Sequence, residues 1–229
     1  MADQSPVLLL SRPAARSHEF LKACEERLGR EIAHVISPVF EIEPVGPVPD
    51  TTDYKTVIFT SGNAVRRMGL AGKLQGQKVA TVGEETGRLS RSFGADAVTL
   101  GANVEEFLAN SRSLEGPCVH LRGRHARGDL AQRLTESGIG TDDIVVYEQV
   151  PQDLTEQAKA LIQSGATVIA PVFSPRSARL LSELLADEDR VTAIAISPAA
   201  ANEWTGRGQI LVAEAPTFDA MVEAVTAAL

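Results

Sequence analysis

The segment Ile58-Phe59-Thr60-Ser61-Gly62-Asn63-Ala64 has a second, altered copy in the chain, Val172-Phe173-Ser174-Pro175-Arg176-Ser177-Ala178, 114 positions further on. The segments Ala80-Thr81-Val82-Gly83 and Ile194-Ala195-Ile196-Ser197 match at the same spacing. Solenoid repeats recur every ~20–50 residues, so a spacing of this size indicates whole domains. A chain of 229 residues has room for two of them, each of about 100 residues.

Short runs rich in Val, Ile and Leu alternate along the chain with longer amphipathic stretches. The runs lack a clean polar alternation, which is typical of parallel strands that helices cover on both faces. The sequence therefore predicts an α/β fold of two similar doubly wound parallel-sheet domains. Strands are predicted at 7–10, 56–59, 78–82, 118–121, 167–170, 191–196 and 209–212. Helices are predicted at 14–28, 63–70, 84–93, 104–110, 127–137, 154–163, 177–186, 198–204 and 218–228.

Two extended segments, 37–44 and 144–151, interrupt this alternation at matching places, and each ends in a proline. If both cross between domains, the first domain comprises 1–37 and 151–229, and the second, 46–143, is inserted into it. Residues 38–45 and 144–150 then form a two-stranded linker, which would act as a hinge. A simple tandem split near residue 115 fits the composition equally well.

Charge and composition limit the possible partners. With a net charge of −8, 44% hydrophobic and 23% charged residues, the chain is typical of globular proteins. We expect neither a nucleic acid nor a membrane as its main partner. The first six residues contain no basic group, and the apolar run 7–10 is too short for a signal peptide or a membrane span, so we expect a cytoplasmic protein.

The familiar cofactor motifs are absent from the sequence. It has no Gly-x-x-x-x-Gly-Lys-Ser/Thr loop, no Gly-x-Gly-x-x-Gly after a strand and no His-Glu-x-x-His. The four histidines show no metal-ligand spacing with cysteines or carboxylates. We therefore predict neither a metal site nor a cofactor.

Hydroxyl-bearing and small residues occupy the predicted strand-to-helix turns. These turns lie at 60–63, 82–86, 173–177 and 196–198. The N-terminus of a helix has unpaired N–H groups and a favourable dipole, so such turns bind anions in open α/β sheets. Helix capping alone would also account for any one of them. Four together favour a ligand site at the carboxyl ends of the strands.

Arginines follow the matched first strands, with Arg12 after one copy and Arg122 and Arg127 after the other. In an acidic protein, arginines near the carboxyl ends of strands indicate a ligand that carries several carboxylates or phosphates. The alternative for each is a solvent-exposed salt bridge with a neighbouring glutamate.

The turns and strands together resemble the uroporphyrinogen-III synthase family over nearly the whole chain. The segments that carry the resemblance, in order, are Ser11-Arg12-Pro13, Phe59-Thr60-Ser61-Gly62-Asn63, Val82-Gly83-Glu84-Glu85-Thr86, His120-Leu121-Arg122-Gly123, Val145-Val146-Tyr147, Phe173-Ser174-Pro175 and Ile196-Ser197-Pro198. The resemblance implies two α/β domains joined by a two-stranded linker. It also implies a hydro-lyase that cyclises hydroxymethylbilane without a cofactor, inverting ring D, to uroporphyrinogen III for haem and tetrapyrrole biosynthesis.

The resemblance further implies roles for individual residues. Tyr147 corresponds to the family's favoured proton donor for the departing hydroxyl and is the expected catalytic residue. One turn departs from the family, because Pro198-Ala199-Ala200 stands where relatives often carry a threonine. The residues expected to bind the small, linear polycarboxylate substrate are Arg12, Thr60, Ser61, Gly62, Asn63, Gly83, Thr86, Arg122, Gly123, Arg127, Ser174, Pro175 and Ser197. We expect a monomer.

Two other functions compete with this interpretation. A cytosolic two-domain binding protein could close on a small polyanion without chemistry, although the sequence shows neither an export signal nor a DNA-binding extension. A phosphosugar or nucleotide enzyme on a doubly wound fold is disfavoured because the glycine-rich loops are absent. Turnover of hydroxymethylbilane distinguishes these alternatives.

Overall fold

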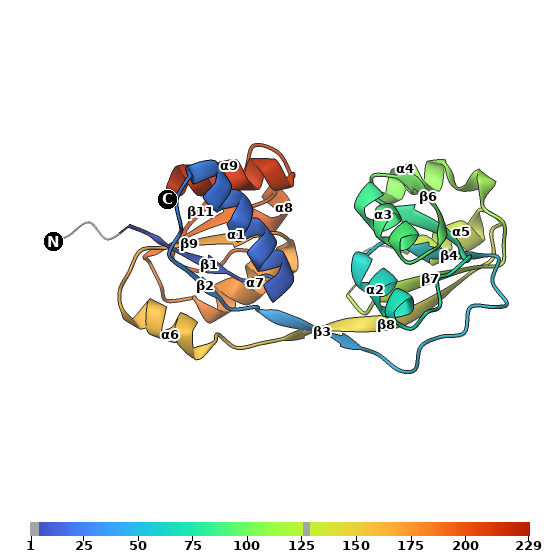
Figure 1. Ribbon diagram of the computed structural model, residues 1–229, viewed down its shortest axis with the longest axis horizontal. Helices are drawn as coiled ribbons and strands as arrows, with labels where there is room; N and C mark the ends of the chain where they lie inside the picture. The colour runs from blue at the N-terminus through green and yellow to red at the C-terminus, as the bar shows by residue number, and fades with distance from the viewer. Residues whose placement is uncertain (1–4, 126–128) are drawn as a thin grey trace. The chain divides into compact units, whose positions relative to one another are not determined.

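A computed structural model describes residues 5–125 and 129–229 of the chain (Figure 1). The chain divides into two compact units. The first comprises the residues up to Glu41 together with Pro151–Leu229, and the second comprises Ile42–Val150. The chain thus leaves the first unit, builds the second, and returns to complete the first.

The first unit contains a five-stranded sheet with the order β11-β10-β9-β1-β2. All of its strand pairs are parallel. Numbered by their appearance in this unit, the strands lie in the order 5-4-3-1-2, which is a doubly wound, flavodoxin-like order. The strands are β1 (Val7–Leu10), β2 (His34–Ile36), β9 (Val168–Val172), β10 (Val191–Ala195) and β11 (Gln209–Val212).

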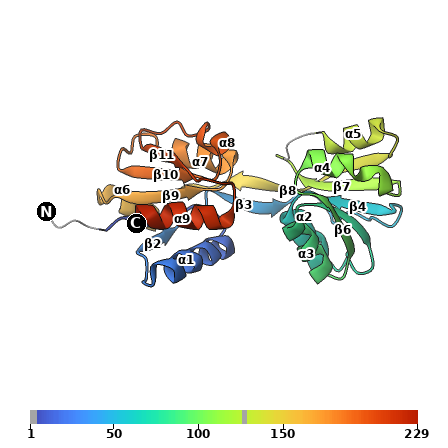
Figure 2. The same cartoon turned by 90° about the horizontal axis from the view of Figure 1, so that it is seen from above.

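Helices cover both faces of this sheet (Figure 2). On one face Leu8 and Leu10 pack against α1 (Ala14–Leu28) and α9 (Phe218–Ala228). On the other face Leu9 belongs to a cluster with residues of three helices, α6 (Glu156–Gln163), α7 (Pro175–Leu184) and α8 (Pro198–Ala201). Successive residues of β1 therefore enter opposite cores, so the strand reads as a continuous apolar run.

The second unit contains a six-stranded sheet with the order β3-β8-β7-β4-β5-β6. Its parallel part, β8-β7-β4-β5-β6, matches β2-β1-β9-β10-β11 position for position when the repeated segments are aligned. The chain enters this copy at its third strand, so the copy is a circular permutation of the first. The strands are β3 (Phe40–Pro44), β4 (Thr56–Phe59), β5 (Lys78–Val82), β6 (Asp96–Gly101), β7 (Cys118–Gly123) and β8 (Thr141–Pro151).

The second sheet is also covered on both faces. Val57 and Phe59 pack in a cluster with residues of α2 (Gly62–Leu70) and α3 (Glu84–Ser92). Ile58 packs on the opposite face with residues of α4 (Val104–Ala109) and α5 (Leu130–Glu136). A short 3₁₀ helix, η1 (Ser111–Ser113), follows α4.

The chain passes between the units along β3 and β8, which are neighbours in the sheet. The N–H of Val45 donates to the carbonyl of Val146, and the N–H of Gln152 donates to the carbonyl of Val39. As one strand advances, its partner runs backwards, so the pair is antiparallel. The guanidinium of Arg67 in α2 donates to the carbonyls of Val45, Gly46 and Val146, and so fastens both strands to the second unit.

The predicted fold class, two similar doubly wound parallel-sheet domains, is confirmed. The strands β2 and β6 were not predicted. Both are edge strands and lack a fully buried apolar run. Helix α8 ends at Ala201 instead of 204. The predicted start of one helix, at 127, lies outside the described residues. Within the described residues, α5 begins at Leu130. Among the described residues, no helix combines the length and apolar character needed to cross a membrane.

Candidate active site

The second unit has a topological switch point between β7 and β4. After β4 the chain turns to α2 on one face of the sheet, and after β7 it continues to α5 on the other face. Open α/β sheets bind ligands outside the carboxyl ends of their strands at such a point. The first predicted turn, Thr60–Asn63, lies here.

The phenol of Tyr147 on β8 points to this turn. Its O–H donates to Ser61 Oγ over 2.9 Å, across 86 positions of sequence. Ser61 is also the N-cap of α2, and its Oγ accepts the backbone N–H of Asn63 over 3.2 Å. The Tyr147 side chain lies in the apolar cluster beside α2, and the residue is 9% exposed. The predicted catalytic residue and a predicted binding residue are therefore in direct contact.

Gly123 allows Tyr147 to take this position. The two residues are partners in the β7–β8 ladder, at a register shift. A Cβ on Gly123 would lie 2.6 Å from the Cζ atom of Tyr147 and 2.9 Å from its hydroxyl oxygen. A side chain at Gly123 would therefore force the tyrosine ring to shift.

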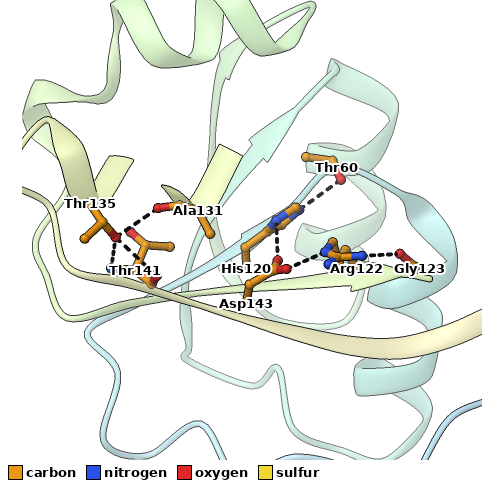
Figure 3. A network of polar contacts seen from close by, with 8 residues as sticks. All are labelled: Thr60, His120, Arg122, Gly123, Ala131, Thr135, Thr141 and Asp143. Carbon is orange, nitrogen blue, oxygen red and sulfur yellow. Dashed lines mark hydrogen bonds and ion pairs between the residues drawn. The ribbon is translucent and has the colours of Figure 1, made fainter. Parts of the chain in front are cut away.

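A second polar network reaches the same turn from the other face of the sheet (Figure 3). His120 on β7 lies between Thr60 and Asp143, with Nε2 at 3.1 Å from Thr60 Oγ1 and Nδ1 at 3.1 Å from Asp143 Oδ1. Arg122 Nε donates to Asp143 Oδ2 over 2.6 Å. Burial lowers the pKa of His120 to about 4; Arg122 acts in the same direction and Asp143 opposes it.

The other predicted binding residues of the second unit occupy nearby turns. Gly62 and Asn63 form the first turn of α2. Gly83 precedes α3 with φ of 79°, a conformation that favours glycine, and Thr86 lies half-buried in the first turn of that helix. Arg122 forms an ion pair with Asp143, an aspartate of the neighbouring strand and not the neighbouring glutamate of the salt-bridge alternative. Arg127 lies outside the described residues.

In the first unit, the corresponding switch point lies between β1 and β9. The guanidinium of Arg12 stacks over the ring of Phe173, 4.1 Å from its centroid, which is a cation–π arrangement. Ser174 caps α7 in a capping box with Ser177, and Pro175 is the first residue of that helix. Ser197 caps the four-residue helix α8 by accepting the N–H of Ala200 over 3.3 Å.

The structure thus brings Thr60, Ser61, Gly123 and Tyr147 together in one unit. In the other unit it places Arg12 against Phe173, the residue that precedes Ser174 and Pro175. The sequence motifs assign no role to His120 or to Asp143. One signal was present in the sequence. Asp143 directly precedes the apolar part of a predicted extended segment, and aspartate is depleted in strands, so its position there indicates a specific partner.

Comparison with known families shows to which family the chain belongs. The family described as Uroporphyrinogen-III synthase HemD matches residues 20–223. The chain belongs to this family. The resemblance predicted from the motifs is confirmed, and the uroporphyrinogen-III synthases are enzymes of tetrapyrrole biosynthesis.

Solved structures of uroporphyrinogen-III synthases share the fold. The enzyme from Helicobacter pylori is 19% identical with a TM-score of 0.70, over 98% of this chain and 99% of that one. A mutant of the enzyme from the extremely thermophilic bacterium Thermus thermophilus is 20% identical with a TM-score of 0.57, over 98% of each chain. No curated protein sequence matches the chain.

Proposed function

We propose that this member of the uroporphyrinogen-III synthase family is a hydro-lyase that cyclises hydroxymethylbilane to uroporphyrinogen III with inversion of ring D. The observation that carries the proposal is the phenol of Tyr147, which lies against the hydroxyl of Ser61 at the switch point of the second unit. Family membership supplies the reaction class, and this contact supplies a proton donor.

Tyr147 acts as the general acid in this proposal. The phenol proton moves to the terminal hydroxyl of the substrate and the C–O bond breaks. The loss of water converts the substrate into an azafulvene cation. In the structure the phenol proton is directed at Ser61, and in the proposed reaction the departing hydroxyl takes the place of that acceptor.

The rest of the site controls conformation. Without the enzyme, the cation closes to the isomer in which ring D keeps its original orientation. The protein must therefore hold ring D with its substituted carbon towards the cation until a spiro intermediate forms. The N–H groups at the start of α2 and α7 and the guanidinium of Arg12 bind carboxylate arms in this scheme. Gly83 and Thr86 at the start of α3, Arg122, Arg127 and Ser197 complete the proposed binding set.

The partner is therefore a small linear tetrapyrrole, and we propose that the enzyme acts as a cytoplasmic monomer without a metal or cofactor. Among residues 5–125 and 129–229, no three His, Cys, Asp or Glu side chains cluster as metal ligands would. Sedimentation at micromolar concentration tests the monomer separately from the chemistry.

The decisive experiment supplies freshly generated hydroxymethylbilane and measures the uroporphyrinogen isomers after oxidation to porphyrins. We expect isomer III in the presence of the protein and isomer I in its absence. Isomer I alone, at the uncatalysed rate, would reject the proposal. Tight binding of the bilane without turnover would instead favour the binding-protein alternative.

A further inference from the structure

The hydroxyls of Thr60 and Ser61 are adjacent in one turn, yet each is held by a different network. Thr60 faces His120, which is buried with 4% of its surface exposed, on the face of the sheet away from α2. Ser61 faces the ring of Tyr147 on the side of α2. The two strands that supply these partners, β7 and β8, are neighbours.

Asp143 sets the tautomer of His120. His120 and Asp143 are register partners across β7 and β8, and the carboxylate lies 3.1 Å from Nδ1. A carboxylate that already accepts from Arg122 Nε can only accept from the imidazole as well, so Nδ1 carries the proton. Nε2 is then an acceptor, and the hydroxyl of Thr60 must donate to it.

The hydroxyl of Thr60 therefore donates within the protein and can only accept hydrogen bonds from a ligand. Its proton is committed to His120, and no other hydrogen bond of its hydroxyl is found within the described ranges 5–125 and 129–229. The lone pairs of Thr60 Oγ1 remain available, and the residue is half-buried. Towards a ligand, Thr60 is therefore an acceptor of hydrogen bonds.

Ser61 has the opposite polarity. Its oxygen accepts both the backbone N–H of Asn63 and the O–H of Tyr147. While Tyr147 donates to Ser61, both lone pairs are occupied, so the hydroxyl proton is what Ser61 can offer to a ligand that has no terminal hydroxyl, such as the cyclised product. One turn thus presents an acceptor and a donor side by side.

We propose that the Asp143–His120 pair is a positioning device that makes Thr60 accept a pyrrole N–H, while Ser61 donates to a carboxylate arm of the same ligand. This inference rests on the proposed function and specifies which part of a tetrapyrrole lies against which hydroxyl. A carboxylate has no proton to give to Thr60, so an anion alone does not satisfy it.

Electrostatics agree with this arrangement. Burial is the largest cause that lowers the pKa of His120, Arg122 lowers it further, and together they outweigh the opposing effect of Asp143, so the imidazole is neutral near pH 7. A protonated imidazole would instead donate from Nε2 and release the proton of Thr60 towards the ligand.

The tautomer is tested by NMR of protein with ¹⁵N-labelled histidine. We expect the His120 signals of a neutral ring with the proton on Nδ1. Asp143→Asn turns the partner into an amide that can donate to Nδ1, so we expect the proton to move to Nε2 in that variant. A wild-type ring protonated on Nε2, or an unchanged tautomer in Asp143→Asn, would overturn the positioning role.

The polarity is tested with two probes that carry the same eight carboxylates. Uroporphyrinogen III has flexible pyrrole rings whose N–H groups can turn outward, whereas the N–H groups of uroporphyrin III point into its planar core. Thr60→Val should lower the affinity for uroporphyrinogen III about five- to tenfold, because one neutral hydrogen bond is lost. The affinity for uroporphyrin III should not change. Ser61→Ala should weaken both probes, and Thr60→Ser should restore the affinity lost in Thr60→Val.

The outcomes separate this inference from the proposed function. If the wild-type protein makes isomer III but Thr60→Val weakens both probes equally, Thr60 binds a carboxylate and the inference is wrong. If the wild-type protein neither makes isomer III nor binds uroporphyrinogen III, the proposed function fails and the assignment of a pyrrole N–H fails with it. The ¹⁵N spectrum still decides the tautomer in that case.

Discussion

Gly123 and Tyr147 lie so close across β7 and β8 that a Cβ on the glycine would come within 2.6 Å of the tyrosine ring. The contact places the phenol 2.9 Å from Ser61, at the carboxyl end of the sheet. A residue without a functional group thus sets the position of the proposed proton donor.

Gly123→Ala should lower turnover of hydroxymethylbilane by about 10- to 100-fold, because displacing a catalytic group by about 1 Å costs rates of this order. The matched control is Gly140→Ala, since a Cβ at Gly140 meets nothing within 4 Å. Initial rates of both variants, with circular dichroism to verify folding, test the prediction. Equal rates for the two variants would mean that the ring position is unimportant.

Tyr147→Phe should keep the fold and lower turnover on the order of 100-fold, the lower end of contributions from general acids. The isomer ratio must be measured with the rate. A slow enzyme that still makes isomer III has lost its acid, whereas one that releases isomer I has lost control of ring D. Wild-type turnover in this variant would reduce Tyr147 to a structural residue.

Arg67→Met should destabilise the protein by about 2–3 kcal/mol in urea unfolding, because it removes the donor shared by the carbonyls of Val45, Gly46 and Val146. Methionine preserves much of the aliphatic stem. Arg112→Met, at an exposed position of η1, is the control and should change the free energy of unfolding by less than about 0.5 kcal/mol. Similar losses in both variants would argue against the fastening role of Arg67.

Stability should fall as the pH drops from about 6.5 towards 4, through His120. The pKa of His120 is lowered from 6.5 to about 4 in the folded protein, so between these values the unfolded chain binds more protons than the folded one. The linked loss amounts to roughly 3 kcal/mol when complete. Urea unfolding at several pH values should show a slope in this window that is smaller in His120→Gln; identical slopes would contradict the shift.

Activity should survive exhaustive chelation and dialysis. The proposed chemistry needs a proton donor and anion-binding groups, which the chain supplies in Tyr147, the starts of α2 and α7, and Arg12. Rates before and after treatment with a chelator give the answer. A loss of turnover that a divalent metal restores would contradict a cofactor-free mechanism.

Much of the fold could be read from local patterns. The apolar runs predicted β1, β4, β5 and β11 at their observed bounds, and the duplicated turns predicted two similar sheets. The permuted entry of the chain into the second sheet is not visible in such patterns, because strand order depends on which distant segments pair. The edge strands β2 and β6 were not predicted from these patterns, because an edge strand needs no continuous apolar run.

The sequence alone determined the fold class, the family and the set of turns at which hydroxyls, glycines and arginines gather, because these depend on residue type and spacing along the chain. The partners of those residues came from tertiary structure. Tyr147 meets Ser61 across 86 positions, and His120 meets Asp143 because parallel pairing of β7 and β8 brings them into register. Hydrogen-bond polarity at Thr60 follows from that pairing, since a hydroxyl donates or accepts according to the group that the fold places opposite it.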